Sequence, residues 1–288
     1  MKKQYLYAAV AIAIWSTTAT VSKLLLHSFD TIQILAVSST VAAVFLLAVN
    51  LIKGSLKQLK TYRLRDYLIT AGVGMLGTFL YNMFLMLGID KLLASQAMII
   101  NYLWPMMAVV AGCILLKERM TVRKAIAVLL SFLGVVIVTT NGDLSNFAGS
   151  NLAGAGFCVL AAVSYGLFVA MNKRLRYDAT LSMMLYYVVS ALVAVTCVVL
   201  TGQIPTLSGT QTLGLLWIGL GDNAIAYVAW ALAMKAGQTA KVANLAYITP
   251  FLSLVVAHFV LGDPFTVWSI GGLLVIVAGI FLQLKDAN

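Results

Sequence analysis

Charged side chains are scarce in this sequence. Asp, Glu, Lys and Arg make up 10% of its 288 residues, and only nine residues are acidic. Soluble domains usually carry about 25% charged residues, so an ordinary soluble domain is excluded. Apolar residues account for 62% of the chain and stand in long uncharged runs. Because a helix needs about 20 apolar residues to cross the hydrocarbon layer, the composition indicates a membrane-spanning protein.

Cysteine and histidine are also rare. The three cysteines, Cys113, Cys158 and Cys197, fall in separate apolar runs without a CxxC spacing or a histidine partner. Neither a disulfide framework nor a metal site is therefore indicated. No nucleotide-binding loop is present, which disfavours an ATP-driven pump. With no cluster of nucleophile, base or metal ligands in the runs, we expect neither an enzyme nor a cofactor.

The apolar runs predict an all-α membrane protein of ten transmembrane helices. They lie near residues 5–26, 31–52, 66–88, 93–116, 122–140, 152–172, 180–201, 210–233, 240–261 and 266–284. The connections are short, so one membrane domain accounts for the chain. Lys2 and Lys3 precede a run as long as a span, which we interpret as an uncleaved first helix rather than a signal peptide.

The net charge of +10 is interpreted as a topology signal, because Lys and Arg gather in cytoplasmic loops of membrane proteins. With a cytoplasmic N-terminus, all of the 19 basic residues except Lys23 and Lys91 fall on the inner side of the ten spans. The sequence therefore predicts an inner-membrane, multi-pass protein with both termini in the cytoplasm. A nucleic-acid partner is not indicated, and the bilayer itself is the expected environment.

The two halves of the chain resemble each other. A shift of 145 residues matches Gly74 with Gly219, Tyr102 with Tyr247, Pro105 with Pro250 and Glu118 with Asp263, and a shift of 150 brings Trp15 onto Tyr165 and Lys23 onto Lys173. We predict a first repeat over residues 1–145 and a second over 146–288. Five spans per repeat is an odd number, so the repeats are inverted, as in many secondary transporters with a substrate site near midplane.

Pro105 and Pro250 occupy equivalent midspan positions of the two repeats. Proline lacks the N–H that would bond the carbonyl four residues earlier, which frees the carbonyls of Asn101 and Ala246. A single proline would favour a plain structural kink. A matched pair of interrupted helices instead points to a binding site, where freed carbonyls face protein, water or ligand rather than lipid.

Helical faces read at i, i+3, i+4 and i+7 predict which side chains surround this site. They mix aromatic rings with neutral amides and hydroxyls, and such a cavity suits a neutral or zwitterionic amphipathic solute. The predicted substrate-binding residues are Trp15, Thr78, Tyr81, Asn101, Trp104, Pro105, Tyr165, Asn223, Tyr227, Trp230, Tyr247 and Pro250.

Asp222 is the one acid that clearly falls within a predicted span. An intramembrane carboxylate is a functional-site hypothesis because burying an unpaired charge is costly. A role in proton coupling or in binding an ammonium group is one interpretation. The alternative places Asp222 nearer the outer interface.

Four motifs, IWST at 14–17, NYLWP at 101–105, AYVAW at 226–230 and ITP at 248–250, resemble the drug/metabolite transporter superfamily in its EamA-type ten-helix form, and within it the bacterial aromatic amino acid exporters. The resemblance covers nearly the whole chain. It implies a basket-shaped bundle whose cavity is lined by spans one, three, four, six, eight and nine, with spans five and ten at the periphery. It also implies export of aromatic amino acids or similar metabolites. Asp222 belongs to none of these motifs.

The leading hypothesis is therefore a secondary active or facilitative exporter of small amphipathic metabolites, aromatic or other neutral amino acids foremost, that works by alternating access as a monomer. An alternative is a proton-coupled exporter of cationic drugs or amines that uses Asp222. A membrane channel is an alternative of another class, although polar residues concentrated near midplane between aromatic barriers do not make a continuous polar path.

Overall fold

The computed structural model describes residues 3–143, 151–175, 177–236 and 245–284, and these residues form helices and no strands. The α-helices are α1 (Lys3–Leu26), α2 (Thr31–Lys53), α3 (Leu64–Gly74), α4 (Tyr81–Lys91), α5 (Ala94–Asn101), α6 (Trp104–Leu115), α7 (Val122–Thr140), α8 (Leu152–Asn172), α9 (Ala179–Thr201), α10 (Gly209–Leu216), α11 (Tyr227–Ala236), α13 (Thr249–Leu261) and α14 (Val267–Leu284).

Eight helical segments of the described chain are long and apolar enough to cross a membrane. They match the first eight predicted spans within a few residues. Two shorter apolar helices, Ala246–Leu261 and Val267–Leu282, occupy the last two predicted ranges. The chain is thus an all-helical membrane protein, and the count of ten spans stays a prediction.

Two of the long segments contain a stretch of π-helix at matching positions. Met75–Leu80 joins α3 to α4, and Trp217–Ala226 joins α10 to α11. A shift of 145 residues, the spacing found in the sequence, superimposes the first stretch on the second. A π-helical turn bonds i to i+5, so each stretch rotates the residues that follow it relative to an uninterrupted α-helix.

Two other segments are interrupted at the prolines. α5 ends at Asn101 and α6 begins at Trp104 with Pro105 in its first turn. A short 3₁₀ turn, Ala246–Ile248, precedes α13, which has Pro250 in its first turn. Proline is tolerated there because the first N–H groups of a helix have no partner within the helix. The predicted interruptions are therefore present at both positions.

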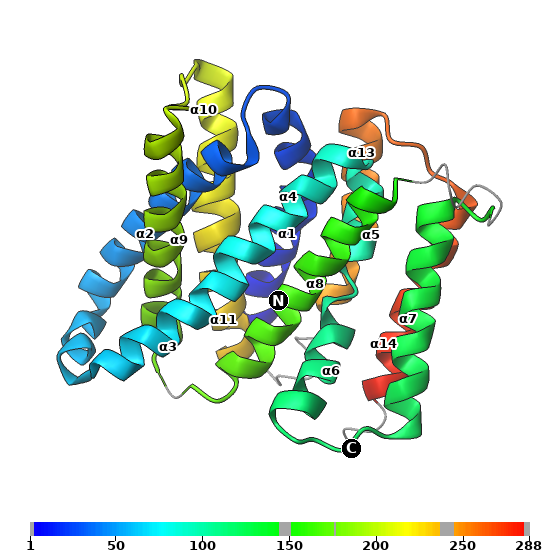
Figure 1. Ribbon diagram of the computed structural model, residues 1–288, viewed down its shortest axis with the longest axis horizontal. Helices are drawn as coiled ribbons and strands as arrows, with labels where there is room; N and C mark the ends of the chain where they lie inside the picture. Colours follow the sequence, from blue (N-terminus) through cyan, green and yellow to red (C-terminus); the bar gives the residue numbers. More distant parts are fainter. Residues whose placement is uncertain (1–2, 144–150, 176, 237–244, 285–288) are drawn as a thin grey trace.

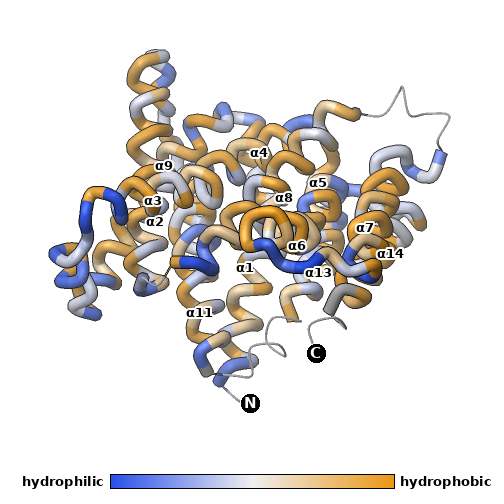
Figure 2. The backbone as a smooth tube through the Cα atoms, turned by 60° about the horizontal axis from the view of Figure 1, so that its bottom comes forward, coloured by the Kyte–Doolittle hydropathy of each residue, from blue (hydrophilic) through white to orange (hydrophobic). Residues whose placement is uncertain are grey.

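The helices form a bundle with two chemically different ends (Figure 1). We call the end with the α2–α3, α6–α7 and α8–α9 connections the basic end, because Lys53, Arg63, Lys117 and Lys173 lie there. The α9–α10 and α13–α14 connections lie at the opposite end. Hydrophilic residues gather at the helix ends while the helices are mainly apolar along their lengths (Figure 2). Four basic residues used in the charge argument, Lys2, Arg176, Lys241 and Lys285, fall outside the described residues, as does the boundary between the predicted repeats.

α7 and α14 pack side by side at one edge of the bundle (Figure 1). Their contact depends on glycines: a Cβ on Gly134 would lie 2.6 Å from the Gly272 carbonyl, and one on Gly279 would lie 2.7 Å from the Ala127 carbonyl. Small residues let membrane helices approach closely where apolar burial provides no driving force. These two helices are the peripheral pair that the resemblance implied.

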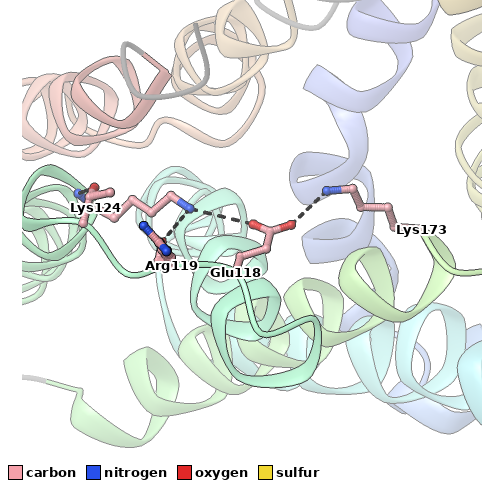
Figure 3. Close-up of polar contacts among 5 residues, drawn as sticks. Glu118, Arg119, Lys124 and Lys173 are labelled. Carbon is pink, nitrogen blue, oxygen red and sulfur yellow. Dashed lines mark hydrogen bonds and ion pairs between the residues drawn. The ribbon is translucent and has the colours of Figure 1, made fainter.

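At the basic end a charged cluster joins three elements (Figure 3). Glu118, in the α6–α7 connection, lies 3.0 Å from Lys173 Nζ at the end of α8 and 3.8 Å from Lys124 Nζ in α7. The hydrogen bond from Lys173 and the positive charge of both lysines hold the pKa of Glu118 below its usual value. The cluster ties α8 to the α6–α7 connection.

Candidate functional site

A cavity of about 300 Å³ lies between helices from both halves of the chain. Its wall combines aromatic rings, amides, hydroxyls and one carboxylate. The residues that line it are Trp15, Thr18, Tyr81, Asn82, Leu85, Met98, Asn101, Tyr102, Trp104, Tyr165, Asp222, Asn223, Tyr227, Trp230, Met234, Ala246, Tyr247 and Thr249.

The rings of the wall form two groups of neighbours. Trp15 of α1 meets Tyr227 and Trp230 of α11 with ring centroids 5.4 Å apart in both pairs. Tyr165 of α8 meets Tyr81 at 4.7 Å and Trp104 edge-on at 5.1 Å. Such separations are the favourable range for aromatic pairs. The wall therefore offers large, rigid apolar faces to a flat solute.

Asp222 contributes the one acidic side chain of this wall. It lies in the π-helical stretch before α11, is 6% exposed, and accepts a hydrogen bond from the Thr18 hydroxyl at 2.6 Å. The neighbouring Asn223 uses its amide oxygen to accept the Tyr187 hydroxyl at 3.0 Å. Among the described residues that line the cavity, none is Lys, Arg or His. In this part of the wall the carboxylate thus has no basic partner.

The proline breaks contribute polar backbone and side-chain atoms to the same cavity. The carbonyl of Ala246, which Pro250 leaves free, accepts the Tyr102 hydroxyl from the other half of the chain. Asn101 donates its amide to the Tyr81 hydroxyl at 3.1 Å, while its amide oxygen is buried without a partner. The Thr249 hydroxyl is buried and unpartnered as well. A bound solute could satisfy both atoms.

Most predicted site residues come together in this cavity. Its wall includes Trp15, Tyr81, Asn101, Trp104, Tyr165, Asn223, Tyr227, Trp230 and Tyr247, together with Asp222. Thr78, Pro105 and Pro250 do not line it. The two prolines shape the wall through the breaks they cause. Thr78 donates its hydroxyl to the carbonyls of Gly74 and Tyr186 and so joins helices.

The π-helical stretches explain why Thr78 falls elsewhere. A face drawn from Thr78 to Tyr81 and Leu85 assumes 3.6 residues per turn, whereas Thr78 lies inside the wider turn Met75–Leu80. Beyond that turn, Asn82 joins Tyr81 and Leu85 in the cavity wall. The repeat could have indicated Asn82, because the 145-residue shift places it on Tyr227. Met98 and Met234 are apolar and left no comparable signal.

A second cavity, of about 470 Å³, lies toward the basic end. Tyr165, Tyr227 and Trp230 line both cavities, and the hydroxyl oxygens of the two tyrosines are 3.5 Å apart. The second cavity is lined by the C-terminal part of α8 and the first turns of α11, and it reaches Lys173 and Tyr177 at the basic end. A layer of three rings thus divides the central cavity from a vestibule at that end.

The repeat shifts relate α8 to α1 and α11 to α4. At the end of the bundle opposite the basic end, α1 and α4 are in contact. Lys23, near the end of α1, donates to the carbonyls of Ile89 at 2.6 Å, Asp90 at 2.8 Å and Leu92 at 2.9 Å, at the end of α4. An ammonium group at a helix C-terminus is stabilised by the unpaired carbonyls and by the helix dipole. This contact fastens the end of α1 to the end of α4.

The geometry agrees with what sequence comparison finds. The sequence profile of the EamA-like transporter family matches residues 2–140 and again residues 152–284. The chain belongs to the EamA-like transporter family. It is accordingly an integral, multi-pass membrane protein of the drug/metabolite transporter superfamily, an EamA-type transporter with two matched halves.

Three curated relatives share 21–26% of their residues with this EamA-type transporter. An uncharacterized transporter of Archaeoglobus fulgidus is 21% identical over 98% of this chain and 99% of its own length. The aromatic amino acid exporter YddG of Ancylobacter novellus is 26% identical over 65% of this chain and 66% of its own. A probable amino-acid metabolite efflux pump of Salmonella typhimurium is 23% identical over 60% and 61%.

A solved crystal structure has the same fold. It superimposes on this EamA-type transporter with a TM-score of 0.66 over 97% of this chain and 96% of its own, at 21% sequence identity.

Proposed function

We propose that this chain exports small amphipathic metabolites, aromatic or other neutral amino acids foremost, across the inner (plasma) membrane by alternating access. Transport is secondary active or facilitative, and the transport unit is a monomer that contacts only its substrate and the lipid bilayer. The observation that carries the proposal is the central cavity, whose aromatic wall comes from both halves and which adjoins a vestibule at the basic end.

The proposed topology is ten spans in two inverted repeats with both termini in the cytoplasm. Support comes from the two family matches, from the eight spans plus two shorter apolar helices, and from the matching π-helical stretches and proline breaks. The basic end then faces the cytoplasm. In that orientation the vestibule opens inward and Lys23 closes the outside, as an exporter awaiting its substrate requires.

The proposed contacts follow from the chemistry of the wall. The rings of Trp15, Trp104 and Trp230 hold the apolar body of the solute, and the amides of Asn101 and Asn223 meet its polar groups. Similar chemistry is implied for two relatives, one named an aromatic amino acid exporter and the other a probable amino-acid metabolite efflux pump.

Counterflow in proteoliposomes tests this function. Vesicles loaded with unlabelled Phe, Tyr, Trp or Thr should transiently accumulate the same labelled amino acid from outside, because a carrier exchanges one molecule for another. Trp104→Ala should lower that accumulation at least severalfold, whereas Trp268→Ala, a partly exposed ring outside the cavity, should leave it unchanged. Absence of counterflow for every metabolite tried would sink the proposal, and non-saturable flux would indicate a channel.

One observation favours a second candidate, the proton-coupled export of cationic drugs or amines. Asp222 is buried in the wall of the central cavity. A carboxylate there could exchange a proton for a cationic substrate. An inward proton gradient should accelerate the efflux of such a cation from vesicles, and Asp222→Asn should abolish that acceleration.

A further inference from the structure

The charge of the central cavity is unbalanced. Asp222 is its acidic wall residue, and the described residues that line it include no Lys, Arg or His. The nearest basic residue on α1, Lys23, has its ammonium group on three carbonyls at the end of α4. A buried carboxylate without a counter-ion is costly in a membrane protein. Among the described residues of the wall, the negative charge of Asp222 therefore has no positive counterpart.

The hydrogen-bonding capacity of the carboxylate is also only partly used. Thr18 donates to one carboxylate oxygen at 2.6 Å, whereas an ionised carboxylate can accept about four hydrogen bonds. The buried amide oxygen of Asn101, another atom of the wall, accepts no hydrogen bond. The Asp222 carboxylate and the Asn101 amide oxygen can thus accept further hydrogen bonds. An ammonium group supplies three donors and no acceptor.

The rings add a further preference for a cation. Trp15 and Tyr227 stand 5.4 Å apart in an edge-to-face arrangement, and Trp230 lies at the same distance from Trp15. Thr18, the partner of Asp222, is less than one helical turn from Trp15 along α1. Aromatic faces attract cations through their quadrupole. An acid set among aromatic rings is the chemistry that recognises an organic ammonium ion.

We propose that Asp222, held by Thr18, is the ammonium-binding subsite of the central cavity, so that substrates of this transporter are aromatic or apolar molecules that carry a protonated amine. This subsite proposal rests on the proposed transport function and narrows the class of substrates that the transporter accepts. A carboxylate on the substrate is not required, because none of the described residues of the cavity wall has a basic side chain to receive one. Amines and amino acids with a free ammonium group are accepted, and aromatic acids without one are rejected.

Three ligands with the same phenyl body separate these requirements. Phenethylamine has the ammonium group alone, phenylalanine has both charges, and 3-phenylpropionate has the carboxylate alone. Binding to the purified full-length protein is followed through quenching of tryptophan fluorescence, since Trp15, Trp104 and Trp230 line the cavity. We expect phenethylamine to bind at least tenfold more tightly than 3-phenylpropionate, with phenylalanine between them. Equal affinities, or no binding by any of the three, would overturn the proposal.

The variant Asp222→Asn keeps the shape of the side chain and removes its charge. We expect its affinity for phenethylamine to fall at least tenfold and that for 3-phenylpropionate to stay equal or rise, a change of charge preference that a merely structural role would not produce. Asp263→Asn is the matched control: Asp263 is also buried, but it accepts hydrogen bonds from Ser95 outside the cavity. Its charge preference should equal that of the wild type.

Failure of the ammonium subsite can be distinguished from failure of the transport function. If phenylalanine shows counterflow but Asp222→Asn discriminates among the three ligands as the wild type does, the subsite is wrong and the transporter function stands. If Asp222→Asn does not fold, the three affinities of the wild-type protein decide the proposal by themselves.

Discussion

Gly166 sets the distance between α8 and α6. A Cβ at this position would lie 2.6 Å from the backbone carbonyl carbon of Met107 and 2.7 Å from the backbone nitrogen of Ala108. Backbone atoms cannot swing aside as a flexible side chain can. The two helices therefore meet at a contact that only glycine permits.

Gly166→Ala should consequently destabilise the protein by about 1–3 kcal/mol through overpacking, although alanine is the better helix former. Gly156→Ala in the same helix is the control, because a Cβ there meets nothing within 4 Å, and it should be neutral or slightly stabilising. Thermal unfolding in detergent measures both. A Gly166→Ala protein as stable as the wild type would show that α6 and α8 can separate without cost.

Some residues of the cavity could be predicted from the sequence and others could not. Trp15, Tyr165 and Trp230 could be placed in the cavity because aromatic rings on a shared helical face, beside amides, leave a readable pattern. Met98 and Thr249 could not, since apolar and hydroxyl residues occur throughout such helices. The hydrogen-bond partner of Asp222 could not be predicted either, because Thr18 lies 204 positions away in the sequence.

At the scale of elements, Lys23 is the contact that closes α1 onto α4. Replacing it by methionine should let the cavity open more often toward the opposite end of the bundle. The accessibility of a cysteine at position 85, in the cavity wall, measures this opening. The three native cysteines are first replaced by alanine. We expect Lys23→Met to raise the labelling of position 85 by a membrane-impermeant thiol reagent, applied from that end, at least severalfold.

Lys91→Met serves as the control for Lys23→Met. Lys91 has the same charge and lies at the end of α4, but its side chain is exposed. Its removal should leave the labelling rate unchanged. Similar rates in both variants and in the wild type would mean that the ammonium group of Lys23 does not keep the opposite end closed.

The cluster at the basic end predicts a pH dependence. Because its lysine partners hold the pKa of Glu118 below the usual value, the ionised side chain stabilises the fold at neutral pH. That contribution, about 0.2–1 kcal/mol for an exposed pair, is complete above the unfolded-state pKa and is lost as pH falls through the lower folded-state pKa.

Unfolding midpoints compared between wild type and Glu118→Gln should therefore differ at pH 7 and converge in the acid range below the usual pKa of glutamate. Asp90→Asn removes an exposed acid at the other end and should not show this pattern. A difference that persists at the lowest pH would assign the effect to the shape of the Glu118 side chain rather than to its charge.

The positions of the helices could be predicted from the sequence, whereas their π-helical stretches could not. Long apolar runs located the helices within a few residues, and prolines located both interruptions, because each of these signals is local. The π-helical stretches left no such signal. They follow from packing between helices, and a face drawn at 3.6 residues per turn therefore misplaced Thr78 while it placed Tyr81 correctly among the rings.

For the whole molecule, the proposed twofold relation predicts contacts of the opposite conformation. It pairs Lys23 with Lys173 and Glu118 with Asp263. The ion pair between Lys173 and Glu118 thus has a counterpart between Lys23 and Asp263, which is not formed here because Lys23 holds the end of α4. When the central cavity opens toward the opposite end, Lys23 should move to Asp263.

A disulfide tests this exchange of partners. Cysteines at positions 23 and 263, with the native cysteines removed, should cross-link mainly under conditions that open the opposite end, and the cross-linked protein should not transport. Cysteines at positions 95 and 263 are the control pair, because Ser95 donates a hydrogen bond to Asp263 at 2.7 Å, and they should cross-link at a constant rate. Cross-linking of the first pair at a constant rate would contradict the twofold exchange.

Symmetry was the most informative feature of the sequence at this scale. It related segments 145 residues apart and so located the breaks that surround one cavity. It could not indicate which end of that cavity is closed, because a twofold relation treats both ends alike. The contacts of Lys23 and the vestibule beside Lys173 had to come from the structure.

The unpaired acid in the cavity wall has a consequence for the return step of the transport cycle. In the proposed alternating-access cycle, Asp222 returns after substrate release through an occluded intermediate with no water on either side, and an isolated charge there costs several kcal/mol. A proton or a second ammonium ion removes that cost. Homoexchange should therefore run at least severalfold faster than net efflux into substrate-free medium, and Asp222→Asn should bring the two rates together; equal rates in the wild-type protein would mean that the empty site returns without a counter-ion.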